Sequence, residues 1–384
     1  FPMSEIRLPS AYTEETPLEH RQKFGQFFTP LPVAEFMANW VADQAPTNSL
    51  ICDPAMGLGV FYQALRNIGY RKSVRSHEID PHILAHTQRT LKADKRHITI
   101  KGDYLQSWTL DKYHGVIANP PYMKFQDFGD RKDFFTDFEA RTGTRLSGYT
   151  NSASAFLIKS ISELSENGRL AYIMPLEFLT TGYGEQVKNI LLNDGLLKTI
   201  IRFENEKEVF PDALTSVGIL LCSKSENREG VRFITVKSIS ELKDKNLESK
   251  GRMIDFSLLE PSTKWLRFFD AETVSLSEKN LVNLRHHGAF KRGIATGANE
   301  FFVLKPSDAK RLKLPGVTLI KAITRSAIIK DPVFSESDVQ TLVDNDDEIY
   351  LFDGLADQGN QNVKKYIQEG QNLGYDKRFL TSKR

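Results

Sequence analysis

Asp53-Pro54-Ala55-Met56-Gly57-Leu58-Gly59-Val60-Phe61 joins a short β-rich run, residues 50–53, to an apolar helical pattern over residues 60–67. The two glycines permit a tight turn and a close approach of the backbone to a ligand, with the N-terminus of the helix behind them. The stretch lacks the third glycine of a dinucleotide fingerprint and the Lys-Ser/Thr of a P-loop, which excludes both of those nucleotide sites. An ordinary strand-to-helix turn also explains Gly-x-Gly alone, so the surrounding sequence has to decide.

The strand–turn–helix unit repeats along the first 225 residues, which is typical of βαβ units on a parallel sheet. We therefore predict an α/β fold with a Rossmann-like domain on a mostly parallel, seven-stranded sheet. The predicted strands are 50–53, 74–79, 98–102, 115–118, 169–174, 198–203 and 216–223. The predicted helices are 31–44, 60–67, 81–93, 153–165 and 185–193.

Beyond residue 225 the alternation stops, and we predict four regions in all. Residues 1–23 form an N-terminal arm and residues 24–225 the α/β domain. Residues 226–260 hold one β-like run and a charged stretch, which indicates a linker region. Residues 261–384 mix short apolar runs with Gly, Pro and charges, and we expect a C-terminal domain of mixed α/β character there.

The composition is that of an ordinary soluble protein, with 40% hydrophobic and 26% charged residues among 384. This balance argues against wholesale disorder. The formal net charge of +2 argues neither for nor against nucleic acid. Two cysteines, Cys52 and Cys222, exclude a disulfide framework and favour a cytoplasmic location. No apolar run approaches the ~20 residues of a membrane-spanning helix, and the eight histidines show no metal-ligand spacing.

Acidic residues stand where the next predicted strands end. Glu78 lies 25 residues after Asp53, and a carboxylate there can accept hydrogen bonds from a ribose diol. Asp80, before Pro81, is a good helix N-cap instead. Asp103 could accept an adenine amino group, although alone it is no better than a turn aspartate. Because open α/β sheets bind ligands at the carboxyl ends of their strands, these acids together predict one ligand site.

Asn119-Pro120-Pro121-Tyr122 directly follows the predicted strand 115–118. Two prolines remove two backbone donors and stiffen the chain, which leaves the local carbonyls free to accept. The Asn119 side-chain oxygen and the Pro120 carbonyl then form a pair of acceptors for one planar amino group, with the Tyr122 ring beside it for stacking. The alternative, a proline-rich turn that only ends a strand, is disfavoured by the acids upstream.

With both motifs in place, residues 24–225 resemble the S-adenosyl-L-methionine-dependent amino-methyltransferases. More narrowly they resemble the adenine-N6 DNA methyltransferases of gamma motif order, TaqI-like or PstI/BsuBI-like, in which target recognition lies C-terminal. The resemblance implies methyl transfer to the N6 amino group of adenine in double-stranded DNA after base flipping. It also implies a restriction–modification system, with a cognate restriction endonuclease acting on the same site.

The resemblance assigns roles to individual residues. The implied cofactor-binding residues are Thr29, Asp53, Gly57, Gly59, Glu78, Asp103 and Phe156. In this set Thr29 lies near the methionine carboxylate, Glu78 on the ribose, and Asp103 and Phe156 on the adenine; Met56 replaces the commoner Cys or Ala of the glycine-rich motif. The implied catalytic residues are Asn119, Pro120, Tyr122 and Phe210. Phe210 matches a residue that stacks on the flipped base.

A basic segment predicts where DNA is bound. Residues 285–330 hold ten basic and two acidic residues, a net charge of +8. Charge runs are usually solvated surface, but the implied DNA substrate favours a phosphate-binding face, with the acidic run 344–348 facing away from it. The predicted DNA contacts are Arg285, Lys291, Arg292, Lys313, Lys321 and Arg325. Relatives similar over 290–297 tend to be longer, so we expect a truncated C-terminal end.

Several alternatives stay open. RNA adenine or a protein glutamine amide could be the substrate, since Asn-Pro-Pro-Tyr serves both in related families, although the basic C-terminal region favours DNA. Pro211-Asp212 with Glu241-Leu242-Lys243 loosely imitates a nuclease metal motif, a spacing that arises easily by chance. A non-catalytic DNA-binding subunit is a third class, which an intact Asn119–Tyr122 disfavours. The Phe-rich segment 124–150 is either a lid over the target base or a hydrophobic patch.

Overall fold

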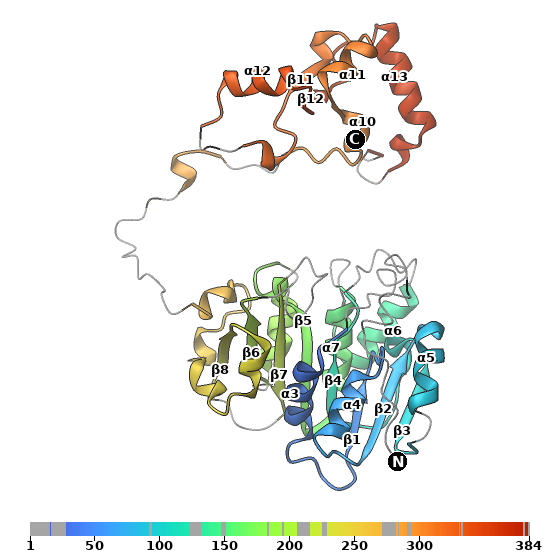
Figure 1. The fold of residues 1–384 in the computed structure, drawn as a ribbon, viewed down its shortest axis with the longest axis vertical. Helices are drawn as coiled ribbons and strands as arrows, with labels where there is room; N and C mark the ends of the chain where they lie inside the picture. Colours follow the sequence, from blue (N-terminus) through green and yellow to red (C-terminus); the bar gives the residue numbers. More distant parts are fainter. Residues whose placement is uncertain are drawn as a thin grey trace. The chain divides into compact units, whose positions relative to one another are not determined.

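The computed structural model describes two compact units, Phe1–Ser275 and Leu276–Arg384 (Figure 1). The described residues are 16, 28–91, 94–122, 132–146, 151–182, 184–193, 196–205, 216–224, 229–270, 282, 284–289, 293–329, 331, 333–378 and 381–382. Apart from residue 16, the predicted N-terminal arm lies outside them. In this described part of the chain, no helix is both long enough and apolar enough to cross a membrane.

A nine-stranded sheet with the order β3-β2-β1-β4-β5-β7-β6-β8-β9 forms the first unit. Its strands are β1 (Leu50–Asp53), β2 (Ser73–Glu78), β3 (His97–Lys101), β4 (Tyr113–Ala118), β5 (Leu164–Pro175), β6 (Leu197–Phe203), β7 (Val217–Ser223), β8 (Val231–Val236) and β9 (Arg252–Ile254). Only β7 and β9 run antiparallel to their neighbours among these strands. All seven predicted strands are present, which confirms the mostly parallel α/β fold, and β8 and β9 extend it.

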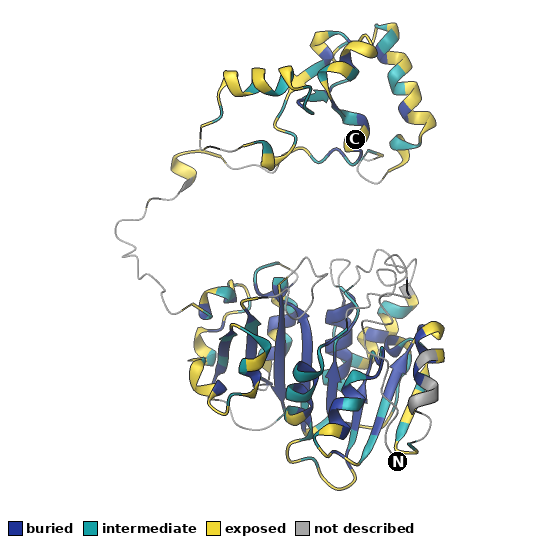
Figure 2. Cartoon of the chain, in the orientation of Figure 1, coloured by how far each residue is buried: buried dark blue, intermediate teal, exposed yellow. Residues whose placement is uncertain are grey.

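Helices cover both faces of this sheet and enclose two apolar clusters. One cluster contains residues of α3 (Leu31–Ala42), α4 (Val60–Asn67) and α5 (Pro81–Leu91), and α3 and α4 lie on the near side in Figure 1. The other contains residues of α6 (Lys132–Thr142), α7 (Ser152–Glu163) and α8 (Gly184–Leu192). Side chains alternate along each strand, so Ile51 and Cys52 enter opposite clusters. Strands buried on both faces read as continuous apolar runs, and all seven residues of β7 are buried (Figure 2).

The boundary between the units lies further along the chain than the sequence predicts. The predicted linker 226–260 contains β8 and β9, which belong to the sheet. Beyond it, Trp265 and Phe268 of the 3-10 helix η8 (Trp265–Phe268) pack on Phe233 of β8, with ring centroids 6.3 and 5.3 Å away. The second unit therefore begins at Leu276 rather than at residue 261. The β-like run of residues 231–236 was recognised but assigned to the linker region, because the short strand and the single helical turns that follow it carry no long hydrophobic period.

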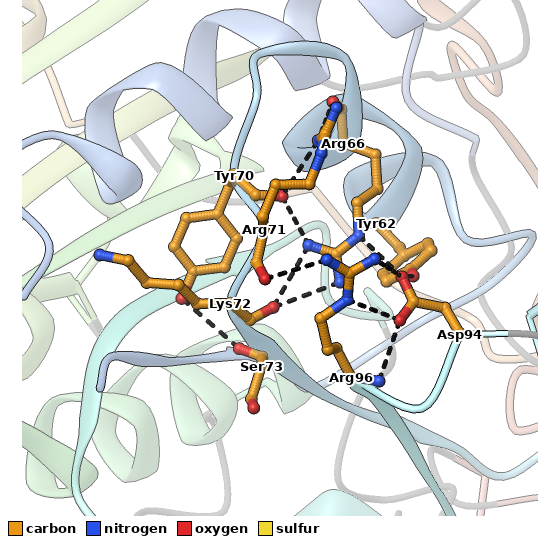
Figure 3. A network of polar contacts seen from close by, with 8 residues as sticks. All are labelled: Tyr62, Arg66, Tyr70, Arg71, Lys72, Ser73, Asp94 and Arg96. Atoms are coloured by element: carbon orange, nitrogen blue, oxygen red, sulfur yellow. Dashed lines mark hydrogen bonds and ion pairs between the residues drawn. The ribbon is translucent and has the colours of Figure 1, made fainter. Parts of the chain in front are cut away.

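A polar network joins the loops that lead into β2 and β3 (Figure 3). Arg66 of α4 is only 6% exposed, and its Nε lies 3.3 Å from Oδ2 of Asp94. The Tyr62 hydroxyl donates to the same Oδ2 at 2.5 Å, and Arg96 donates to both carboxylate oxygens. These donors, Arg96 first, hold the pKa of Asp94 well below its usual range. The network gives the buried guanidinium an ion pair with Asp94 and carbonyl acceptors at Tyr70 and Lys72, although its Nε makes no hydrogen bond among the described residues.

The second unit has a small antiparallel sheet with the order β10-β12-β11. Its elements are α10 (Asn299–Phe302), β10 (Val303–Leu304), α11 (Pro306–Arg311), β11 (Leu319–Lys321), α12 (Glu336–Asp344), β12 (Tyr350–Phe352) and α13 (Gln361–Asn372). Phe301 is central to its core, and the Tyr366 ring of α13 stacks on it at 4.7 Å and 11°. Gly370, one turn further along α13, faces the same phenyl ring where a Cβ would clash. The predicted mixed α/β character is confirmed.

Candidate active site

A pocket lies at the carboxyl ends of β1, β2, β3 and β4, where the acids were predicted to converge. It encloses about 600 Å³ of empty space, part of which is open to solvent. Of the predicted site residues, it is lined by Gly57, Glu78, Asp103, Asn119 and Phe156. These residues come from five separate stretches of sequence. The fold therefore gathers the glycine-rich turn, two of the acids, the aromatic residue and the asparagine around one cavity.

Glu78 holds the glycine-rich turn against the end of β2. Its Oε2 accepts from the backbone N–H of Gly57 at 2.8 Å, and its Oε1 accepts from that of Asp80 at 2.8 Å. Gly57 and Gly59 have φ of 53° and 81°, in the left-handed region that favours glycine. Burial raises the pKa of Glu78, and the two backbone donors oppose that rise. As expected, Asp80 caps α5, since its Oδ1 accepts from the N–H of His82 at 2.9 Å.

Asp53 is fully buried beneath the turn, and half of its carboxylate is unsatisfied. Its Oδ1 accepts from the N–H of Ala55 at 3.2 Å, whereas its Oδ2 has no hydrogen-bond partner among the described residues. Burial raises the pKa of Asp53 to about 8. Pro54 and Ala55, the next two residues, line the pocket. Asp53 itself is not among the described residues that line the pocket, so its carboxyl would act on a cationic group of a ligand from behind the turn.

Two aromatic residues of the pocket were not predicted. His77 is 2% exposed, and within the described structure neither of its ring nitrogens has a hydrogen-bond partner. Its ring lies 5.1 Å from that of Tyr104, which lies 5.3 Å from that of Phe156. Burial lowers the pKa of His77 to about 4, so the imidazole is neutral near pH 7. The sequence offered one signal for them: His77 directly precedes Glu78, and Tyr104 directly follows Asp103.

Tyr104 rests on a buried charged pair. Its hydroxyl donates to Oε2 of Glu163 at 2.7 Å, and Nζ of Lys159 lies 4.0 Å from the centroid of its ring. Lys159 and Glu163, one turn apart on α7, form an ion pair with each other. A desolvated charge that is paired in this way resists displacement, because breaking the pair leaves an uncompensated charge. The aromatic wall of the pocket is therefore held in place from behind.

Asn119 is held by hydrogen bonds at both ends of its amide. Nδ2 donates to Oγ1 of Thr29 at 3.2 Å, and Oδ1 accepts from the Tyr122 hydroxyl at 2.6 Å. The same hydroxyl lies 3.2 Å from the carbonyl oxygen of Ile173 in β5. Pro120 is buried. The prediction placed Tyr122 beside the amino group as a stacking ring, but it did not foresee that its hydroxyl contacts the Asn119 oxygen.

The Pro121 carbonyl accepts from the Ser152 hydroxyl, which anchors the motif to the start of α7. Pro121 itself lines the pocket beside Asn119. The turn after β4 is therefore tied to β5, to α7 and to the chain before α3. Its rigidity comes from these contacts as well as from the two prolines.

Thr29 is 2% exposed and contacts Asn119, whereas its neighbour Phe28 lines the pocket. The Phe28 ring lies 3.8 Å from the position that a Cβ on Gly57 would take. The predicted base-stacking residue Phe210 lies outside the described residues. Phe28-Thr29 thus runs between the glycine-rich turn and the asparagine.

The Phe-rich segment belongs in part to the core. Phe138 of α6 is fully buried, and Phe134 and Phe135 pack against the same apolar cluster. Phe125 and Phe128 lie outside the described residues. For the phenylalanines of α6, the hydrophobic patch is the correct alternative.

The predicted DNA-binding residues that lie within the described part of the chain are exposed. Arg285, Lys313, Lys321 and Arg325 are exposed, and Lys291 and Arg292 lie outside the described residues. Nη2 of Arg325 lies 3.1 Å from Oε2 of Glu348, in the acidic run 344–348. That run was expected to face away from the DNA phosphates, and this expectation stays a prediction. Its last residue, Glu348, lies near Arg325 because β11 and β12 pair side by side.

Comparisons with known proteins agree with this geometry. The model of the family "N-6 DNA Methylase" matches residues 15–256, and that of the C-terminal domain of the type II methyltransferase M.Eco57I matches residues 264–384. The type II methyltransferase M.AccI of Acinetobacter calcoaceticus is 35% identical over 381 residues, which cover 97% of this chain and 70% of that protein.

A second relative, M.HincII of Haemophilus influenzae, is 29% identical over 246 residues, which cover 63% of this chain and 45% of that protein. The type IIG restriction endonuclease BpuSI has a similar fold, with a TM-score of 0.56 and 15% identity over 92% of this chain and 46% of that one. The chain therefore belongs to the N-6 DNA methylase family and is an S-adenosylmethionine-dependent DNA methyltransferase of the type II kind.

Proposed function

We propose that this chain transfers a methyl group from S-adenosylmethionine to the N6 amino group of adenine in duplex DNA. One observation carries the proposal: Asn119 shares a single pocket with Gly57, Glu78 and Asp103. A cofactor held by the turn and the acids would place its reactive end toward the asparagine. The target amine would then lie close to the methyl group and within reach of the Asn119 side-chain oxygen, which can accept its hydrogen bond.

The pocket fits the cofactor on its own chemistry. S-adenosylmethionine carries positive charge, and the unpartnered Oδ2 of buried Asp53 suits a cation. Glu78 would accept from the ribose hydroxyls and Asp103 from the adenine amino group. The rings of Phe156 and Tyr104, which are tilted by 42° to each other, provide an apolar wall for the purine. When bound, the cofactor supplies a methyl group that its sulfonium already activates.

Asn119 and Pro120 would act on the amine. The exocyclic nitrogen of adenine is a poor nucleophile because its lone pair is delocalised into the ring. Two acceptors that hold its hydrogens, Asn119 Oδ1 and the Pro120 carbonyl, would let the nitrogen become pyramidal and regain a usable lone pair. In-line transfer then requires positioning rather than a strong base.

The base has to leave the helix before it reaches this place. Flipping costs a few kcal/mol, which stacking on the Tyr122 ring would offset. The Tyr122 hydroxyl now contacts the Asn119 oxygen that the amine needs. We infer that the amine of the incoming base replaces this hydroxyl at Oδ1, while the ring stays alongside.

DNA is favoured over RNA adenine and protein glutamine. The curated relatives are type II methyltransferases, and the matching family is named for DNA. Lys313 and Lys321 are exposed and would contact phosphates; Arg325, which shares its charge with Glu348, would contribute less. The partner expected for such a modification enzyme is a restriction endonuclease that cuts the same site, and both would act on DNA in the cytoplasm.

The substrate class can be tested with tritium-labelled cofactor and three separate acceptors. These are genomic DNA from a strain without adenine methylation, total RNA, and a lysate cleared of nucleic acid. We expect label in DNA, and none in DNA when Asn119→Ala replaces the wild type. Label confined to RNA or to protein would contradict the proposed substrate.

A further inference from the structure

Thr29 is the residue of this site whose contact differs from its expected role. The sequence resemblance places it near the methionine carboxylate of the cofactor. In the structure its Oγ1 instead accepts from Nδ2 of Asn119 at 3.2 Å, across 90 positions of the chain. Thr29 is 2% exposed, and the pocket lining formed by described residues includes its neighbour Phe28 but not Thr29.

We propose that Thr29 is a positioning residue that holds the side-chain amide of Asn119 in its reactive place. The proposal rests on the proposed function, in which Asn119 Oδ1 accepts from the target amine. The prolines that follow Asn119 stiffen its backbone but leave its two side-chain torsions free. A hydrogen bond to Nδ2, at the opposite end of the amide, restricts those torsions without occupying the oxygen that the reaction uses.

A side chain that positions another must itself be held in one place, and the Thr29 side chain meets this condition. Its β-branched side chain has few rotamers, and it lies next to Pro30, whose carbonyl oxygen accepts from the N–H groups of Val33 and Ala34 at 3.0 Å each. α3 follows directly and buries Val33, Ala34, Met37, Ala38 and Val41 against the sheet. The hydroxyl is thus attached to the packed core.

The Tyr122 hydroxyl cannot replace Thr29 during the reaction. It contacts Oδ1, which is the atom that the incoming amine takes over in the proposed function. From that moment the hydrogen bond to Thr29 still holds the amide, at the end that the amine does not use. A displacement of about 1 Å at a reacting centre lowers the rate about 10²-fold.

The test compares Thr29→Val, which keeps the shape and removes the hydroxyl, with Thr29→Ser, which keeps the hydroxyl. For the full chain we would measure kcat and KM with DNA, the Kd of S-adenosylmethionine by calorimetry, and the melting temperature. In Thr29→Val we expect kcat to fall about 10- to 100-fold, with the cofactor Kd within about twofold of wild type. Thr29→Ser should recover most of kcat.

Two outcomes would overturn the assignment. If Thr29→Val weakened cofactor binding and left kcat at saturation unchanged, Thr29 would be a cofactor ligand, as the sequence resemblance implies. If neither quantity changed, the hydrogen bond would have no role. Asn119→Ala, measured in parallel, separates the two proposals: wild-type turnover in that variant would refute the proposed function itself.

A spectroscopic readout keeps the proposal testable without turnover. With ¹⁵N-labelled asparagine, the side-chain NH₂ signal that disappears in Asn119→Ala belongs to Asn119. That signal should shift in Thr29→Val and return close to its original position in Thr29→Ser. If Thr29→Val is too unstable to study, Thr29→Ala serves in its place. An unchanged signal in the variant without the hydroxyl would contradict the contact.

Discussion

Buried polar side chains have partners within the protein at the amino ends of β1, β2 and β3, but several lack them at the carboxyl ends. At the amino ends, Arg66 pairs with Asp94, and the Tyr62 hydroxyl and Arg96 complete the network (Figure 3). At the carboxyl ends, within the described residues, Asp53 Oδ2 and both ring nitrogens of His77 have no hydrogen-bond partner. Both ends belong to the same strands.

The difference separates what stabilises the fold from what binds a ligand. An unsatisfied buried polar group costs about 1–3 kcal/mol, so a chain that keeps several at one edge of its sheet has a use for them. Partners at the amino end come from the chain itself. At the carboxyl end we expect them to come from the cofactor and from the target base.

The largest effect should follow from Asn119→Ala. This change removes one of the two acceptors for the amine, at a residue whose side chain bonds to Thr29 and Tyr122. Turnover should fall by about 10³-fold or more, the upper range for loss of one preorganised catalytic hydrogen bond. The cofactor Kd, measured by calorimetry, should stay within about threefold of wild type, because the glycine-rich turn and the acids that would hold the cofactor are unchanged. A large loss of cofactor affinity would place Asn119 on the cofactor instead.

The next largest effect should be on stability, at the opposite end of the strands. Asp94→Ala leaves the guanidinium of Arg66 without its ion pair and should lower the free energy of unfolding by about 3 kcal/mol. Asp137→Ala, which breaks the exposed pair with Arg141, is the matched control and should cost about 0–1 kcal/mol. Cofactor affinity of the folded protein should not change in either variant. If urea titrations gave equal losses in the free energy of unfolding for the two variants, the buried network would contribute no more to stability than an exposed ion pair.

The same network gives a pH dependence with a definite sign. The folded-state pKa of Asp94 is lowered, so its contribution to stability is present above its unfolded pKa of about 4 and is lost as the pH falls through the folded value. Wild type should therefore lose more stability than Asp94→Ala between pH 5 and about pH 2.

A smaller effect should distinguish the two functions of Tyr122. Tyr122→Phe keeps the ring and loses the hydroxyl that contacts Asn119, whereas Tyr122→Ala loses both. Stacking is worth roughly 1–3 kcal/mol per base, so the alanine variant should lose about 10- to 100-fold in turnover. Its defect should shrink when the target adenine sits opposite a mismatch, because less opening energy remains to be offset. If phenylalanine were as harmful as alanine, the hydroxyl rather than the ring would matter.

The smallest effect concerns Asp53 and the pH. Its raised pKa of about 8 means that the carboxyl is mostly protonated near pH 7 in the free protein. A cationic cofactor favours the ionised form, so binding should release a proton and tighten by up to about tenfold for each pH unit between pH 6 and 7.5. Asp53→Asn should bind with nearly constant affinity over that range. Calorimetry in two buffers of different ionisation enthalpy would show whether the proton is released.

The sequence predicts the sheet and the members of the site better than the contacts between them. Strand positions follow from local apolar runs, and the rule that ligands bind at carboxyl ends brings Asp53, Glu78 and Asp103 together. The hydrogen bond from Asn119 to Thr29 spans 90 residues and depends on how α3 docks, so no local pattern contains it. His77 was missed for a related reason, since a buried histidine stands out only once its nitrogens are seen to lack partners.

Nucleoside mass spectrometry of DNA after reaction with cofactor that carries a deuterated methyl group would show directly which base atom receives the methyl group. The proposed function predicts labelled N6-methyladenine with the wild type, and none with Asn119→Ala under the same conditions. Label in N4-methylcytosine, or labelled N6-methyladenine at the wild-type level in Asn119→Ala, would contradict it.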